Sequence, residues 1–125
     1  MPLSSARDER GFLRLTIDGP WPTLAELMAW YKLVGDLRAM RLLLIDIRGS
    51  RGAFPRFPDI RDTVGAFESD VRFASERRRA VVVSSDVQFG VARSFEALVT
   101  GEMQVFRDEP SAIAWLLAGS NREPS

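Results

Sequence analysis

The sequence contains no cysteine and no histidine in its 125 residues. The absence of cysteine excludes disulfides, thiolate nucleophiles, iron–sulfur clusters and cysteine-ligated zinc. The absence of histidine removes the commonest general base and the commonest metal ligand. Carboxylates, serines, Tyr31 and the single lysine, Lys32, are the catalytic groups that remain. We therefore expect a protein that is not an enzyme and that carries no metal and no cofactor.

Net charge and long apolar runs are also missing. The 17 basic and 17 acidic residues cancel, so no overall field attracts nucleic acid. No segment approaches the ~18 apolar residues of a membrane span, and residues 1–11 lack the apolar core of a signal peptide. We expect a cytoplasmic protein that binds no nucleic acid. With 46% apolar and 27% charged residues, residues 1–125 are typical of a single globular domain with a core at about 11–119.

Apolar periodicity predicts four strands. Residues 12–19 alternate as in a strand with one face buried. The turn residues before them indicate that residues 2–6 pair with this strand as the other arm of a hairpin. Two near-continuous apolar runs, at 41–49 and 78–86, predict strands that are covered on both faces. We expect residues 41–47 and 79–84 to be adjacent, parallel and central. A short edge strand is expected at residues 103–106.

Four helices are expected between and after these strands, starting near Thr23, Asp59, Asp86 and Asp108. Thr23 and Glu26 have the spacing of a capping box, and Asp86 is expected to cap the third helix. The side chains predicted to face the sheet are, in chain order, Leu24, Leu27, Met28, Tyr31, Val34 and Leu37, with Trp30 at the margin; Ile60, Val64, Phe67 and Val71; Ala92, Phe95 and Val99; and Ala112, Ile113, Leu116 and Leu117, with Trp115 beside them. The alternation predicts an α/β fold, a single mixed, mostly parallel four- to five-stranded sheet covered by four helices.

Several segments carry a family resemblance. LLLIDIRG, AVVV, the AR-x-F-x-x-L helix of residues 92–98, and VFRD followed by A-x-x-WL resemble, in this order, the SpoIIAA-like family, a branch of the STAS domains that is also grouped with CRAL-TRIO lipid-binding folds. The resemblance implies a non-enzymatic regulatory or protein-interaction module. Its CRAL-TRIO side implies the alternative, a binder of a lipid or other apolar small molecule. A ligand binder needs an apolar cavity between sheet and helices, whereas an interaction module needs a packed core with an exposed apolar patch.

One family feature is absent. STAS proteins that antagonise anti-sigma factors carry a D-S-S-G-like phosphoacceptor at the start of the helix after the first buried strand. The corresponding region here is DIRGSRGAFPRFPDI, in which Ser50 is the only hydroxyl. Ser50 lies well before the helix start expected near Asp59, so a serine switch by this route is not expected.

The loop at residues 49–58 is the candidate contact site, because ligands of open α/β sheets gather at the carboxyl ends of central strands. Its phenylalanines suit an apolar ligand, a protein partner or a membrane surface, and its arginines suit anionic groups. In the alternative, both phenylalanines fold back onto the core. A homodimer is also left open. We expect Phe54 and Phe57 to be more exposed than Phe95 and Trp115. The candidate contact residues are Ser50, Arg51, Phe54, Arg56, Phe57 and Arg61.

Three other polar groups have structural interpretations. Asp46, Asp59 and Asp62 could bind a metal ion, but the surrounding arginines favour ion pairs. The run ERRR at residues 76–79 is typical of a solvated turn. The run SSD at residues 84–86 indicates a helix cap and not a nucleophile.

Overall fold

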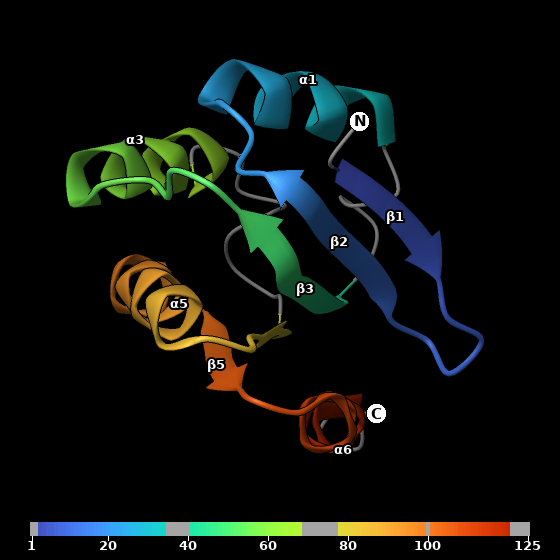
Figure 1. The fold of residues 1–125 in the computed structure, drawn as a ribbon. Helices are drawn as coiled ribbons and strands as arrows, with labels where there is room; N and C mark the ends of the chain where they lie inside the picture. Colours follow the sequence, from blue (N-terminus) through green and yellow to red (C-terminus); the bar gives the residue numbers. More distant parts are fainter. Residues whose placement is uncertain (1–2, 35–40, 69–77, 100, 121–125) are drawn as a thin grey trace.

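The computed structural model describes residues 3–34, 41–68, 78–99 and 101–120, whose strands form one five-stranded sheet (Figure 1). The strand order is β1-β2-β3-β4-β5. The elements are β1 (Leu3–Arg7), β2 (Leu13–Pro20), α1 (Leu24–Val34), β3 (Leu42–Arg51), α3 (Phe57–Glu68), β4 (Arg78–Val82), α5 (Asp86–Leu98), β5 (Glu102–Phe106) and α6 (Glu109–Ser120). The predicted fold class, a mixed and mostly parallel α/β sheet, is confirmed.

Strand pairing follows the sequence prediction closely. β1 and β2 form the expected antiparallel hairpin, with Leu3 opposite Ile17. β3 lies parallel to β4, with Leu44 opposite Ala80, and both strands have a neighbour on each side. The two apolar runs are therefore adjacent, parallel and central, as predicted. β5 is an edge strand.

The helices cover both faces of the sheet unequally. α1, α3 and α5 lie on one face, and α6 lies on the other (Figure 1). Each of α1, α3 and α5 joins two neighbouring parallel strands, and the strands are added in one direction across the sheet. Because such crossovers share one handedness, they place their helices on the same face. Only the helix after the last strand is free to turn to the opposite face.

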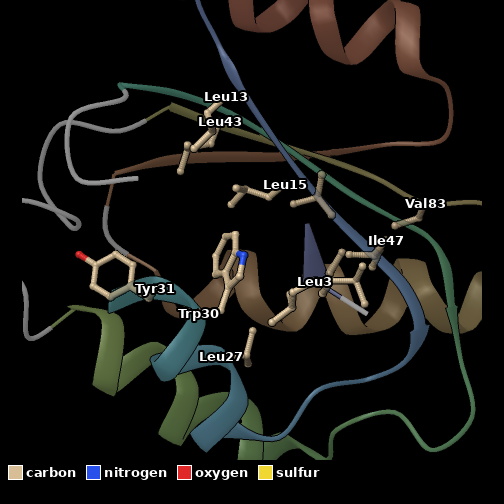
Figure 2. Close-up of a cluster of buried hydrophobic side chains, with 12 residues drawn as sticks. Leu3, Leu13, Leu15, Leu27, Trp30, Tyr31, Leu43, Ile47 and Val83 are labelled. Carbon is tan, nitrogen blue, oxygen red and sulfur yellow. The ribbon is translucent and has the colours of Figure 1, made fainter. Parts of the chain in front are cut away.

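The larger buried cluster lies between the sheet and α1. It contains Leu3, Leu13, Leu15, Ile17, Leu27, Trp30, Tyr31, Leu43, Ile47, Val81, Val83 and Ala92. Figure 2 shows the Trp30 ring projecting from α1 toward the strands. The prediction for α1 is wrong in two positions: Trp30 is buried, and Leu24 is exposed. The buried stripe is Leu27, Trp30 and Tyr31, an i, i+3, i+4 set that is rotated from the predicted one.

A second buried cluster lies under α6. Its members are Phe12, Leu42, Leu44, Ala80, Val82, Ala112, Ile113 and Leu116. The predicted inner side of this helix is confirmed for Ala112, Ile113 and Leu116, whereas Leu117 and Trp115 are half-buried. Together with the first cluster, this one explains why β3 and β4 are apolar on both faces.

Arg78 and Arg79 do not belong to a solvated turn, so that prediction is wrong for these two residues; Glu76 and Arg77 lie outside the described residues. Arg78 and Arg79 are the first residues of the central strand β4 and are only 6% and 1% exposed. The Arg78 guanidinium lies 3.8 Å from the centre of the Trp115 ring and 3.3 Å from Glu102. A guanidinium can be buried in this way because an aromatic face and a carboxylate both favour its charge.

Helix starts follow capping chemistry. The Thr23–Glu26 capping box is confirmed, with Glu26 N–H donating to Thr23 Oγ1 (3.1 Å) and Thr23 N–H donating to Glu26 Oε1 (2.9 Å). The Ser111 N–H donates to Asp108 Oδ1 (2.8 Å). The prediction that Asp86 caps the third helix is wrong. Ser85 caps α5, and its Oγ accepts from Gln88 N–H (3.1 Å).

α3 starts at Phe57, two residues before the predicted start. Asp59 Oδ2 accepts from Arg56 N–H (3.2 Å), which is the carboxylate half of a capping box around Arg56. Pro58 is tolerated because the first turn of a helix needs no N–H there. Ile60 and Val64 are buried as predicted. Leu37 and Val71 lie outside the described residues.

In the part of the chain that the structure describes, no helix has both the length and the apolar character needed to cross a membrane.

Candidate functional site

The predicted contact loop is much shorter in the structure. β3 continues to Arg51, and Gly49, Ser50 and Arg51 pair with the end of β2. Ser50 is 5% exposed, and its hydroxyl donates to the Ile47 carbonyl. A buried serine with its hydroxyl bound inside the strand cannot contact a partner or a kinase. The assignment of Ser50 as a contact residue is therefore corrected.

Gln88 explains how β3 can extend past the end of β4. Its side-chain amide donates to the carbonyls of Arg48 and Ser50, both at 3.1 Å. Its Oε1 accepts from Ser84 N–H (2.8 Å). The buried amide of Gln88 thus supplies the hydrogen bonds that a longer β4 would have given. The sequence analysis missed this residue, because a lone glutamine in a helix carries no signal of its partners.

The two loop phenylalanines have different environments. Phe57 is 52% exposed, so it is more exposed than the half-buried Phe95 and Trp115, as predicted. Phe54 is half-buried, as Phe95 and Trp115 are, so its greater exposure stays a prediction. Its ring centre lies 6.2 Å from that of Trp21, and the alternative interpretation, that it folds back onto the core, holds for this residue.

The other candidate contact residues lie on the surface near Phe57. Arg51 ends β3, Arg56 precedes α3, and Arg61 lies in the second turn of α3; all three are exposed. Two further apolar side chains are exposed at the starts of helices: Leu24 in α1 and Val87 in α5. Since α1, α3 and α5 each begin after a parallel strand, Leu24, Phe57 and Val87 all lie at the carboxyl end of the sheet.

An apolar pocket lies between the sheet and α1, α3 and α5. It has a volume of about 140 Å³. The lining residues are Leu3, Leu15, Ile17, Leu43, Ile45, Ile47, Arg79, Val81 and Met103 from strands, Leu27, Trp30, Thr63, Val64, Phe67, Ala92 and Phe95 from helices, and Trp21 and Val99 from connecting segments. Figure 2 shows several of these side chains, Trp30 among them, between α1 and the strands. The pocket lies where the ligand-binding interpretation places a cavity, between the sheet and the helices, but it is smaller than the ~300–1,000 Å³ of typical ligand sites.

The sequence predicted parts of this wall. Ala92, Phe95 and Val99 were expected to face the sheet, and all three line the pocket. Trp21 was missed, because it lies between two prolines outside any periodic segment. Its ring centre is 6.2 Å from that of Phe95. The pocket itself was not predictable, since periodicity tells which side chains face inward but not whether they fill the space between them.

An ion-pair network lies on the opposite face of the sheet, at the start of α6. Arg14 donates to both carboxylate oxygens of Glu109 (2.9 Å each). Arg48 bridges Glu109 (2.9 Å) and Asp46 (2.8 Å), and Arg14 also lies 3.7 Å from Asp46. The interpretation of Asp46 as an ion-pair partner is confirmed. The network joins α6 to β2 and β3.

The network shifts the titration of its members. Burial opposes ionisation of Asp46, but hydrogen bonds from Arg48 and the charges of Arg48 and Arg14 outweigh it and lower the pKa of this carboxyl. Hydrogen bonds from Arg14 lower the pKa of Glu109. The hydrogen bond to Asp46 raises the pKa of Arg48. All these groups are therefore charged at neutral pH, as structural ion pairs are.

Carboxylates do not gather elsewhere on the described surface. Among residues 3–34, 41–68, 78–99 and 101–120, no three acidic side chains come close enough to hold a metal ion. Asp59 is engaged at the start of α3, where it accepts from Arg56 N–H.

Comparison with known proteins identifies the fold. No family model matches the chain, and no curated protein sequence does either. The crystal structure of an uncharacterized protein of the DUF3478 family from Shewanella loihica PV-4, described as SpoIIAA-like in fold, matches with a TM-score of 0.63. The two sequences are 19% identical, and the match covers 91% of each chain. In agreement with the resemblance seen in its sequence, the chain has a SpoIIAA-like fold.

Proposed function

We propose that this protein is a non-enzymatic binding module of a bacterial cytoplasm, and that it holds a small apolar molecule between its sheet and α1, α3 and α5. The observation that carries the proposal is the apolar pocket of about 140 Å³ in that position. Protein interiors are normally packed with few voids larger than a water molecule. A retained space of this size and lining reduces stability, and a ligand that fills it restores the lost contacts.

Two positions allow this proposal to be tested. Ala92 lines the pocket, so an Ala92→Leu side chain would occupy its space. Ala114 is exposed on α6, at the other face of the sheet, so Ala114→Leu is a matched control. We expect toluene, added as a probe, to shift the methyl NMR signals of pocket residues such as Leu15 and Val81 in a saturable manner. Ala92→Leu should abolish this effect, and Ala114→Leu should retain it.

Native mass spectrometry of freshly purified protein complements the titration, because it detects a molecule that was bound in the cell and gives the stoichiometry at the same time. The proposal fails if toluene does not perturb the pocket methyl groups, or if Ala92→Leu responds as the unmodified protein does.

A second candidate function, a protein-interaction module, is favoured by one specific observation. Phe57 and Val87, which are 52% and 58% exposed, and Leu24 place apolar side chains at the carboxyl end of the sheet. Exposed apolar side chains that gather on one surface are typical of contact sites. The double substitution Phe57→Ser with Val87→Ser should then weaken self-association in analytical ultracentrifugation. If the unmodified protein is monomeric at all concentrations, this surface does not serve a homodimer.

A further inference from the structure

The chemistry of the pocket wall restricts what the pocket can hold. Of its lining residues, Thr63, Arg79 and the indole N–H groups of Trp21 and Trp30 are the polar side-chain groups. The Thr63 hydroxyl is engaged, since it donates to the Asp59 carbonyl (2.9 Å). Arg79 is 1% exposed, and its Nε and Nη1 atoms have no accessible surface. The surface that faces the pocket is therefore almost entirely carbon.

Such a wall disfavours polar ligands. A carboxylate, hydroxyl or amide that enters the pocket gives up its hydrogen bonds to water and meets a surface on which almost no polar atom is accessible. Burying a polar group without a compensating hydrogen bond is costly, and burying an isolated charge is far more so. An apolar molecule loses nothing of this kind and gains dispersion contacts with the carbon atoms of the wall.

The volume restricts the ligand as well. At about 140 Å³, the pocket is well below the ~300–1,000 Å³ of sites that enclose drug-sized molecules. It is similar to an engineered apolar cavity of ~150 Å³ in another protein, which stays dry and binds benzene. A ring-sized group fills it, whereas a long acyl chain exceeds it.

We infer that the ligand of this pocket, whose existence rests on the function proposed above, is an uncharged apolar molecule of about the size of one ring, and that fatty acids and other carboxylates are excluded. Of the lipid or other apolar small molecules expected from the sequence, only small uncharged ones then remain as ligands. The pocket selects against polar ligands because almost no polar atom is accessible on its surface. The size of the ligand is limited by the four aromatic residues of the wall: Trp21, Trp30, Phe67 and Phe95.

Three probes of related shape test this inference on the full chain. Toluene is neutral and ring-sized, benzoate has the same ring with a carboxylate, and naphthalene is neutral but larger. We expect saturable binding of toluene by methyl NMR, with benzoate at least ~100-fold weaker because its carboxylate would lose its hydration against a surface that is almost entirely carbon. Naphthalene should bind more weakly than toluene, and Phe95→Ala should reverse that order by enlarging the pocket.

The outcomes separate the two proposals. If none of the three probes binds, the proposed function itself fails. If benzoate binds as tightly as toluene, the function survives but the inference on ligand charge is overturned. If naphthalene binds more tightly than toluene to the unmodified protein, the inference on size is overturned. Should Phe95→Ala fail to fold, the toluene–benzoate comparison on the unmodified chain still decides the question of charge.

Discussion

Replacing Gln88 by leucine should destabilise the protein out of proportion to the size of the change. The substitution keeps a buried side chain of similar length but removes the amide. The carbonyls of Arg48 and Ser50 then lose their donor, and Ser84 N–H loses its acceptor. A buried group left without its partner costs about 1–3 kcal/mol. The hydrogen bond to the Ser50 carbonyl is buried and the other two are partly buried, so we expect a loss of about 1–3 kcal/mol in the free energy of unfolding.

Gln104 provides the control for this experiment. It lies on the edge strand β5 and is exposed, so Gln104→Leu should change stability by no more than ~0.5 kcal/mol. Urea unfolding followed by circular dichroism measures both variants against the unmodified protein. A loss below ~1 kcal/mol for Gln88→Leu, or equal losses for both variants, would refute the view that the amide completes the sheet.

Two further predictions concern charge and the loop aromatics. Because the pKa of Asp46 is lowered in the folded state, its contribution to stability is present above about pH 4, the unfolded value, and is lost as the pH falls through the folded one. Asp46→Asn should therefore cost about 1.5–3 kcal/mol at pH 7 and progressively less toward pH 2 in thermal unfolding; a pH-independent difference would contradict this. Phe57→Ser should lower the free energy of unfolding by less than ~0.5 kcal/mol, whereas Phe54→Ser should lower it by about 2 kcal/mol. Equal losses for the two variants in urea unfolding would show that Phe54 does not pack against Trp21 as described.

The arrangement of strands was predictable from the sequence for a clear reason. The runs LLLI and AVVV are apolar at consecutive positions, which only a strand with both faces covered requires. Their separation by an amphipathic segment demands a crossover, and the handedness of crossovers leaves few topologies. Where a helix end carried a reciprocal side-chain pair, as at Thr23 and Glu26, its start was also predictable.

The errors came from positions whose environment is decided by distant segments. Gly-Ser-Arg-Gly at residues 49–52 has the composition of a loop, yet the end of β2 pairs with it and keeps Ser50 inside the sheet. Arg78 resembled a solvated charge, yet Trp115, far along the chain, covers its guanidinium. Local composition cannot show such partners, since they depend on which elements meet after folding.

None of the predicted contact residues lines the apolar pocket, and their contact with a partner stays a prediction. The carboxyl end of the sheet does carry an exposed phenylalanine, Phe57, as strand polarity implies. The apolar pocket has no counterpart in the sequence, because it results from the volumes of side chains that six or more elements bring together. A substitution such as Ala92→Leu would leave the predicted fold unchanged and remove the pocket.

The position of α6 has a consequence for the order in which the protein is made. The strands can pair one after another as they leave the ribosome, because each lies beside its predecessor in the sequence. The face formed by Leu42, Leu44 and Val82, however, has no cover until α6 emerges. At ~5–20 residues per second, the roughly 60 residues between β3 and α6 take several seconds. During that time Arg14 and Arg48, which pair with Glu109 in the folded protein, would place charges on an otherwise apolar surface and oppose aggregation of the nascent chain.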